Sequence, residues 1–302
     1  MEKIENYIYL AEDTDLPNSS NIETTDQNLS VDLMFQQSGI QSLATQICSV
    51  VEMIGPTAAL FNIVKKDNEN SFKILRKEVQ CFPSRIIKTG LTREVVQDSF
   101  SQFGKETEVI IGNLLRGISN KYENDKLFEL LDNECVEYDS ITFSQLNNAE
   151  MNFFEITQKV HELILKMNIK NQRTYNAFAV IPYIVLAGIM GIKNLTKNNE
   201  IEENGLFITE IGKTKYFINP YVDNTNIYVG LKDENDLTKS SLVFGKYQNS
   251  ISDATDPETG EIHYYLANRF SITSSPLHLP GDEMLYKIKA VIWCLNNFLK
   301  MM

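Results

Sequence analysis

The spacing of apolar residues divides the start of the chain into a polar stretch and a periodic one. Residues 12–32 are polar, have few aromatic side chains and show no period, so they predict an extended arm outside any core. From Leu33 onward, apolar residues recur at helical steps through Leu43, Ile47 and Val51. This pattern predicts a first helix that follows the arm.

The next segment has the pattern of a β-hairpin that begins at a rigid turn. Gly55 and Pro56 end the first helix, because proline fixes φ and favours extended geometry in the residue before it. The apolar stretches TAALFNIV and SFKILRKEV follow, joined by the polar sequence KKDNEN. They predict two strands and a loop of about five residues. A tip this rich in charge predicts a hairpin that projects from the body of the protein.

Two longer stretches have the period of amphipathic helices. The first covers residues 105–131, after a helical region that opens at Thr92. Its apolar stripe recurs at Ile110, Leu114, Ile118 and Tyr122. The second stretch covers residues 148–170, and its apolar positions include Phe154, Val160, Leu163 and Ile164. The sequence therefore predicts one very long helix and one of ordinary length.

The second half of the chain is richer in strand patterns. A buried strand from Ala177, bounded by Pro182, is expected to lead into a short helix. Short strand candidates between Gly, Asn and Asp turns fill residues 205–248, and another spans residues 262–273. Residues 283–302 fit either an amphipathic helix after Asp282 or a strand. The predicted fold class is α+β, without an internal repeat.

Composition and charge narrow the classes of protein. The 302 residues are 43% hydrophobic, enough for one large domain or two modest ones. A net charge of −12, with no basic run longer than two residues, argues against a protein that grips nucleic acid. The four cysteines, Cys48, Cys81, Cys135 and Cys294, are too far apart for a zinc ribbon or a disulfide framework, which favours a reducing compartment.

The sequence does not predict a secretory or membrane protein. Its N-terminal residues mix acidic and apolar side chains and lack the apolar core of a signal peptide. The most membrane-like stretch, residues 177–192, is too short to span a bilayer and contains Pro182 and two glycines.

Candidate chemistry is sparse. The three histidines, His161, His263 and His278, lie in no recognisable catalytic motif, and no phosphate-binding loop or nucleophile elbow is present. Glu106 and Glu108 fit first-turn helix charges, which suit the helix dipole. The acids around Gly260 miss the spacing of a calcium loop. We therefore expect no catalytic residues, no metal site and no cofactor.

Four motifs, in chain order, resemble the major capsid proteins of tailed phages of the T-even type, which have the HK97-like fold. The first is VVEMIGPTAALFNIV, which is similar to the family signature at Met53, Gly55, Pro56, Thr57 and Phe61 and differs at Ala58. The second runs from Phe72 into the long helix and matches at Phe72, Ile74, Val79, Ser84, Arg85, Lys88, Thr92, Glu94, Gln97, Asp98 and Glu108.

The third and fourth motifs lie in the second half of the chain. KYFINPYVDNTNIYVGLKD is similar to a strand pair of the family at Asn219, Pro220, Val229 and Gly230. YYLANRFSITSSP resembles a late segment at Arg269, Phe270, Ile272 and Pro276. The matches extend over most of the chain, but the extra domain that many members carry inside the hairpin is replaced by KKDNEN.

The resemblance implies a division of the chain into named parts. Residues 1–50 would form an N-terminal arm and first helix, and residues 51–90 an E-loop hairpin. Residues 91–147 would form a peripheral domain with the long spine helix, residues 148–268 an axial domain, and residues 269–302 a return to the peripheral domain with a C-terminal segment.

The resemblance also implies a structural function. The chain would be a non-enzymatic capsid subunit of a virion that assembles with itself, in the host cytoplasm, into hexamers and pentamers of an icosahedral head. DNA would be enclosed cargo only, and portal, vertex, scaffold or decoration proteins are possible partners. The related vertex protein and an encapsulin-like compartment shell are alternatives. A soluble enzyme that uses His161 or His263 is the alternative of a different class.

Specific residues follow from this resemblance. Assembly through the hairpin would involve Gly55, Pro56, Thr57, Phe61, Lys73, Arg76, Lys77, Ser84 and Arg85. Structural roles in the peripheral and axial parts would fall to Glu94, Gln97, Asp98, Pro220, Gly230 and Arg269. The basic hairpin residues would make assembly sensitive to salt. Arg85 and Arg269 are either partners in ion pairs between subunits or domains, or ordinary arginines. A maturation protease could cut after Glu12.

Overall fold

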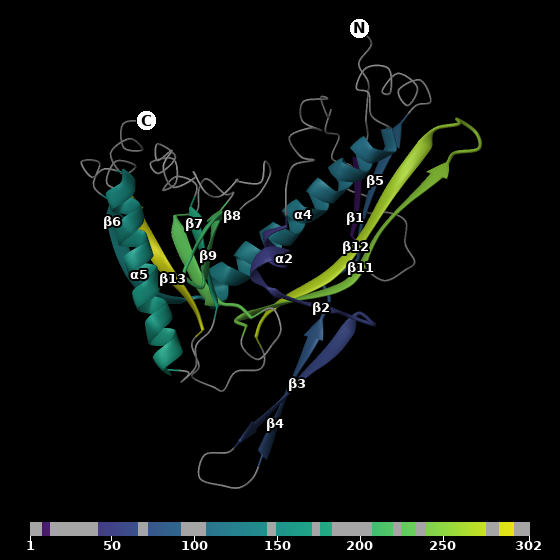
Figure 1. The fold of residues 1–302 in the computed structure, drawn as a ribbon. Coiled ribbons are helices and arrows are strands. Elements are labelled where there is room, and N and C mark those ends of the chain that lie inside the picture. The colour runs from purple at the N-terminus through teal and green to yellow at the C-terminus, as the bar shows by residue number, and fades with distance from the viewer. Residues whose placement is uncertain are drawn as a thin grey trace.

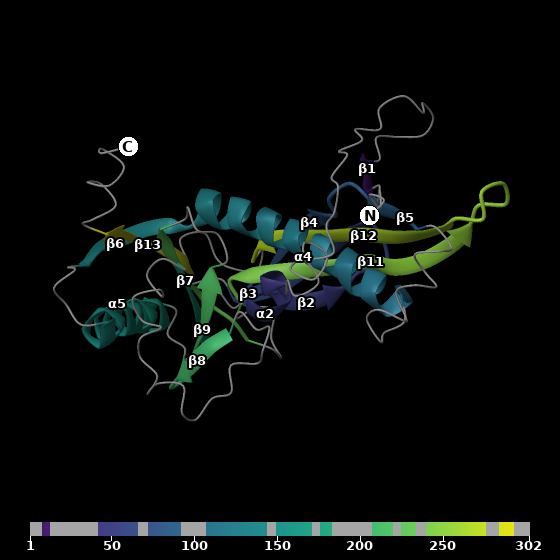
Figure 2. The ribbon, with the colours of Figure 1, turned by 90° about the horizontal axis from the view of Figure 1, so that it is seen from above.

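The computed structural model describes residues 8–12, 42–65, 72–91, 107–143, 149–170, 176–182, 207–219, 225–233, 240–275 and 284–292. This part of the chain forms three helices, two sheets and a separate hairpin. A six-stranded sheet with one helix lies at one end of the molecule and a five-stranded sheet lies at the other (Figures 1 and 2).

The five-stranded sheet has the strand order β1-β5-β12-β11-β2. Its strands are β1 (Ile8–Glu12), β2 (Ser49–Glu52), β5 (Arg85–Leu91), β11 (Leu242–Thr255) and β12 (Ile262–Ser274). The long helix α4 (Thr107–Glu134) runs along one face of this sheet, beside the short helix α2 (Leu43–Ile47) (Figure 1). Five buried residues join helix and sheet: Ile87, Ile111, Leu115, Tyr264 and Leu266.

The six-stranded sheet has the strand order β6-β13-β10-β7-β9-β8. Its strands are β6 (Val136–Phe143), β7 (Ala177–Pro182), β8 (Phe207–Ile211), β9 (Thr214–Asn219), β10 (Asn226–Leu231) and β13 (Leu285–Ile292). Every residue of β7 is buried, as expected for a central strand that reads as a continuous apolar run. Helix α5 (Ala149–Lys170) covers one face through Ile156, Val160 and Leu163.

The two sheets share a core. One cluster of buried residues combines Phe178 and Tyr228 of the six-stranded sheet with Phe244 and Phe270 of the five-stranded sheet. The C-terminal turns of α4 join the same cluster, and the Tyr228 hydroxyl donates a 2.5 Å hydrogen bond to Asp132 at that end of the helix. The long helix therefore connects the two sheets into one packed body.

Strands β3 (Thr57–Lys65) and β4 (Phe72–Gln80) form a sheet of their own. They pair antiparallel from Thr57↔Gln80 to Lys65↔Phe72 and point away from the rest of the molecule (Figure 1). The hairpin and both long helices are thus confirmed as elements. The helical region from Thr92 and the short helix after Pro182 lie outside the described residues.

The first helix is shorter than the apolar spacing predicts. It ends at Ile47, and Val51 lies in β2, where it pairs in parallel with Gly245 of β11. Consecutive β-branched residues favour a strand once a partner strand is available, so sheet pairing overrides the helical period here.

By sequence, residues 283–302 fit either a helix or a strand. The described residues 285–292 form a strand, β13 (Leu285–Ile292). This strand is paired on both sides, with β10 and with β6. Ile288 and Ala290 are buried, whereas Lys287 is half-buried and Lys289 is exposed, which is the alternation of a strand.

The expected boundary at 268/269 falls within a strand of the five-stranded sheet, and the division into domains stays a prediction. Asn268 and Arg269 lie in the middle of β12, whose pairing with β11 runs from Ile262 to Ser274. After β10 of the six-stranded sheet, the chain returns to the five-stranded sheet at Leu242, and β13 belongs again to the six-stranded sheet. A boundary at 268 would cut a continuous strand.

Candidate assembly surfaces

The base of the hairpin is tied to the body of the protein by backbone hydrogen bonds. The Met53 amide donates to the Lys246 carbonyl of β11 at 2.8 Å, and within the hairpin itself the Cys81 amide donates to the Pro56 carbonyl at 2.8 Å. The Cys81 thiol also contacts the Met53 sulfur at 3.6 Å. The turn between Met53 and Thr57 therefore fixes where the hairpin leaves the five-stranded sheet.

A second attachment lies just after β4. The Phe82 amide donates to the Phe270 carbonyl at 2.7 Å, and the two rings meet edge to face with centroids 5.3 Å apart. Gly55 is half-buried, Pro56 and Thr57 are exposed, and Ile54 beside them is fully exposed. The turn thus carries an apolar side chain on its outer surface.

Beyond its base, the hairpin contacts the body through Lys77, within the part of the chain that the structure describes. The Lys77 ammonium donates to the Ser274 carbonyl at 3.2 Å, which attaches β4 to the end of β12. Arg76 and Glu78 form an exposed ion pair at 2.6 Å within the hairpin itself. Phe61 pairs with Arg76 across the hairpin, and Lys73 pairs with Val64 nearer the tip. The structure thus places Thr57, Phe61, Lys73, Arg76 and Lys77 on one projecting element, whereas Ser84 and Arg85 lie beyond it.

The two candidate arginines contact aromatic rings of their own chain. The Arg85 guanidinium carbon lies 4.4 Å from the centroid of the Tyr122 ring on α4. That of Arg269 lies 5.9 Å from the Tyr247 centroid, and its buried Nε has no hydrogen-bond partner. Such cation–π contacts hold both side chains against the body of the protein. Whether either arginine also meets another subunit stays a prediction.

The remaining predicted residues are spread over the molecule. Ser84 is half-buried in the segment before β5, and Glu12 is the last residue of β1, opposite Arg85. Gly230 lies in β10, where a Cβ would come within 2.5 Å of the Phe178 ring, so only glycine fits there. Glu94, Gln97, Asp98 and Pro220 lie outside the described residues.

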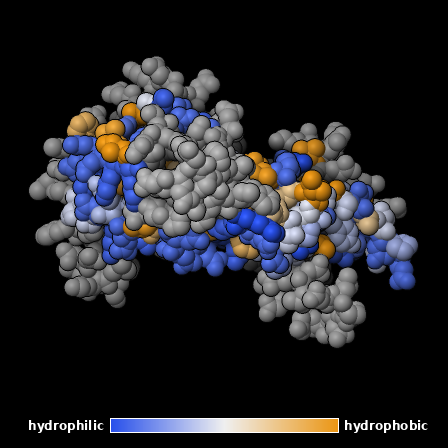
Figure 3. Space-filling view, turned by 90° about the horizontal axis from the view of Figure 1, so that it is seen from below, coloured by the Kyte–Doolittle hydropathy of each residue, from blue (hydrophilic) through white to orange (hydrophobic). Residues whose placement is uncertain are grey.

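Helix α5 carries an exposed apolar face. One of its residues, Phe154, belongs to the apolar positions by which the sequence predicts this helix. Phe154, Leu165 and Ile169 are 65%, 60% and 76% exposed. At 100° per residue the three positions fall within about 60° of one another on the side opposite the sheet. Figure 3 shows apolar atoms among hydrophilic ones at the end of the molecule that holds α5. We refer to these three residues as the α5 outer face.

The side chains considered for chemistry do not converge. The ring of His161 bonds the Thr157 carbonyl at 2.7 Å on α5, whereas His263 lies in β12 of the other sheet, 4.0 Å from Glu261. Among the residues that the structure describes, no group of three or more His, Cys, Asp or Glu side chains is placed to hold a metal ion. None of the described helices is long and apolar enough to cross a membrane.

The described cysteines are buried free thiols: Cys48, Cys81 and Cys135. Burial raises the pKa of Cys48 to about 12, although the nearby Lys232 opposes this shift. Burial likewise raises the pKa of Cys81 and of Cys135. Because the thiolate is the reactive form, these thiols are poor nucleophiles.

Comparison by sequence finds no relative: no protein-family model matches the chain, and no curated protein is significantly similar to it. Comparison by structure does find similar proteins. The chain resembles the mature capsid of bacteriophage PhiM1, with 10% identity, a TM-score of 0.51, and 83% of this chain and 87% of that chain covered.

Two further solved structures are similar over nearly their whole length. The capsid of cyanophage P-SCSP1u has 7% identity and a TM-score of 0.52, with 81% of this chain and 86% of that chain covered. The virus-like particle from Pyrococcus furiosus has 12% identity and a TM-score of 0.50, with 85% of this chain and 96% of that chain covered. The chain therefore has the mixed α+β, HK97-like fold of phage capsid proteins.

Proposed function

We propose that this protein is a capsid subunit that builds a closed shell by self-association. The observation that carries the proposal is the HK97-like fold, shared over more than four-fifths of the chain with proteins of phage capsids and of a virus-like particle. At sequence identities of 7–12%, a shared fold does not by itself establish a shared function. The hairpin and the α5 outer face supply the independent support.

The hairpin supports self-association because, within the part of the chain that the structure describes, no third strand pairs with it. A two-stranded hairpin is at best marginally stable in water and needs a third strand or a packed face. Here β3 and β4 are held at their base and by Lys77, while the strands continue for several residues beyond that point. The surface of a neighbouring copy would supply the missing layer.

The α5 outer face supports the same function. Three large apolar side chains on one helix face are costly in water and become favourable when a partner covers them. A second copy of this chain is the partner that shell formation provides. Many such contacts, each modest, add up in a closed shell through multivalency.

The finer assignments rest on the sequence motifs. The four motifs favour the T-even type and hence hexamers and pentamers around packaged DNA in a virion assembled in the host cytoplasm. No catalytic role is proposed. The likeness to the Pyrococcus furiosus particle keeps an encapsulin-like compartment as the second candidate, and the vertex protein is the third.

Expression followed by negative-stain microscopy and sedimentation velocity tests the proposal. Shells, tubes or hexameric rings are expected. A stable monomer at all protein and salt concentrations, with a defined small-molecule activity, would refute it. The ratio of absorbance at 260 and 280 nm of virions or particles from the native source separates the first two candidates, because a phage head contains DNA.

A further inference from the structure

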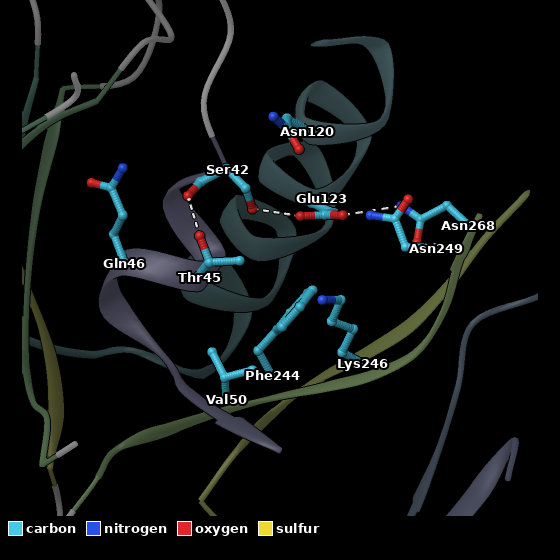
Figure 4. A pocket seen from close by; sticks show the side chains of 10 residues that line it. All are labelled: Ser42, Thr45, Gln46, Val50, Asn120, Glu123, Phe244, Lys246, Asn249 and Asn268. Atoms are coloured by element: carbon cyan, nitrogen blue, oxygen red, sulfur yellow. Dashed lines mark hydrogen bonds between the residues drawn. The ribbon is translucent and has the colours of Figure 1, made fainter. Parts of the chain in front are cut away.

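An open pocket of about 450 Å³, lined by polar and apolar side chains, lies where α2, α4 and β11 meet. Figure 4 shows side chains from both helices and from β2, β11 and β12 around it. Glu123, on α4, is only 4% exposed and lines this pocket. A buried carboxylate with access to a water-sized space can exchange protons with solvent.

Glu123 connects three elements through hydrogen bonds (Figure 4). The Ser42 hydroxyl, at the start of α2, donates to Glu123 Oε2 at 2.5 Å, and the Asn268 amide of β12 donates to Oε1 at 3.0 Å. The same Asn268 nitrogen also contacts the Ser119 hydroxyl, one turn earlier on α4. Beside this cluster, the Leu43 amide donates to Asn124 at 2.7 Å. The start of α2 is therefore fastened to α4 by two polar contacts.

The charges around Glu123 compensate its burial only in part. Lys246 of β11 acts on Glu123, but its side chain is 44% exposed and also lies 3.7 Å from Glu52 of β2. Helix α2 has no ionisable side chain, and the nearest charged residue along β12 is Arg269, which faces Tyr247. On α4 itself, Lys126 pairs with Glu129 at 3.0 Å. Burial raises the pKa of Glu123, although the bonds from Ser42 and Asn268 and the charge of Lys246 oppose this shift.

The hydrogen bonds do not by themselves require an acid at this position. A glutamine would accept from Asn268 through its oxygen and donate to the Ser42 oxygen through its nitrogen. The serine hydroxyl can donate to a carboxylate or accept from a carboxylic acid, so both protonation states of Glu123 fit the same geometry. What glutamate adds is a group that can become a poorly compensated buried charge.

We propose that Glu123 makes the junction between α2, α4 and β12 sensitive to protons, so that it is tight when Glu123 is protonated and loosens when Glu123 ionises. The native chain holds this proton at higher pH than the unfolded chain does. The contribution of Glu123 to stability is therefore fully present below the ordinary carboxyl pKa and is lost as pH rises through the raised value. Helix α2 leads directly into β2 and the base of the hairpin. A weaker contact between Ser42 and α4 would therefore also weaken the attachment of the hairpin.

Hydrogen exchange of the full-length chain at pH 5 and pH 8 tests the proposal independently of shell formation. Expressed as protection factors, which remove the intrinsic effect of pH, protection at residues 42–52 is expected to be about tenfold lower at pH 8. The Glu123→Gln variant is expected to show the same protection at both pH values. The control is Glu134→Gln, an exposed carboxylate on the same helix, which is expected to behave like the wild-type protein.

Two results would overturn the proposal. One is a wild-type pH dependence that survives Glu123→Gln, and the other is a Glu123→Gln variant that is less protected than the wild-type protein at both pH values. Should that variant fail to fold, Ser42→Ala replaces it. Removing the hydroxyl raises the pKa of Glu123 further, so the loss of protection is expected to move to higher pH, and an unmoved transition would contradict the proposal.

Discussion

The molecule contains two long antiparallel strand pairs, β3–β4 and β11–β12, with very different surroundings. The pair β11–β12 is flanked by β2 and β5, and α4 packs along it, so its buried side chains have neighbours within the chain. The pair β3–β4 is a sheet of two strands. Antiparallel pairing of two long strands thus contributes to an internal core in one case and to a projecting element in the other. Pairing alone does not explain the hairpin, because a sheet of two strands is marginally stable in water; under the proposed function, the surface of another copy would stabilise it.

The largest effect on assembly is expected when the tip of the hairpin is deleted. Deletion of residues 66–70 is expected to abolish assembly and to leave the monomer folded, because the backbone ties between hairpin and body lie at its base. Sedimentation velocity measures assembly, and circular dichroism measures folding. A five-residue Gly/Ser replacement of the same segment is the matched variant, which separates chain length from sequence. Shells of normal yield from the deletion variant would remove the hairpin from the assembly mechanism.

A charge on the α5 outer face is the next test. Leu165→Glu is expected to weaken assembly by about tenfold or more, because a buried leucine contributes about 1.5–3 kcal/mol that a carboxylate cannot replace. The free energy of unfolding of the monomer should change by less than about 0.5 kcal/mol, since Leu165 is exposed. The control is Asn133→Glu, an exposed position on α4. Equal assembly of both variants would exclude this face as a contact.

Gly230→Ala tests the internal packing of the six-stranded sheet. The added methyl group would lie about as close to the Ser241 hydroxyl, at 2.6 Å, as to the Phe178 ring. We expect a loss of about 1–3 kcal/mol in the free energy of unfolding, measured by urea denaturation. Gly55→Ala at the hairpin turn is the control, because its nearest neighbour would be 3.8 Å away. An unchanged midpoint for Gly230→Ala would contradict the close packing.

The smallest effect is expected on the shaft of the hairpin. Lys77→Met removes the hydrogen bond to the Ser274 carbonyl and should cost about 1 kcal/mol. Arg76→Gln removes the exposed ion pair with Glu78 and should cost less than about 0.5 kcal/mol. Urea denaturation of the two variants in parallel measures the difference. A larger loss for Arg76→Gln would mean that the shaft is held in a way other than the structure indicates.

Local periodicity was enough to predict the elements whose partners are near in sequence. The two long helices follow from their apolar stripes, and the hairpin follows from two apolar runs with a polar loop between them. The strands β2 and β6 were not predicted, because their partners are distant: Ser49 of β2 pairs with Val243, and Val136 of β6 pairs with Tyr286. Their existence depends on long-range pairing, which single-sequence patterns do not encode.

Glu123 was also missed, although the sequence holds a signal for it. Leu115, Ser119, Glu123 and Leu127 follow one another at intervals of four along the same side of α4, and all are buried. A polar pair inside an apolar row indicates an internal hydrogen-bond cluster. The partners Ser42 and Asn268 are far away in the chain, so the chemistry of the cluster required the structure.

The order of the five-stranded sheet has one consequence for the N-terminal segment. Strand β1 forms one edge of this sheet and β2 forms the other, so both edges belong to the first 52 residues. Exposed edge strands are templates for pairing with other chains. Removal of this segment would open the outer edges of β5 and β11 together. A truncated chain would therefore gain two sites for strand addition at the same time as the shared core loses the buried residues Leu43, Ala44, Ile47 and Cys48.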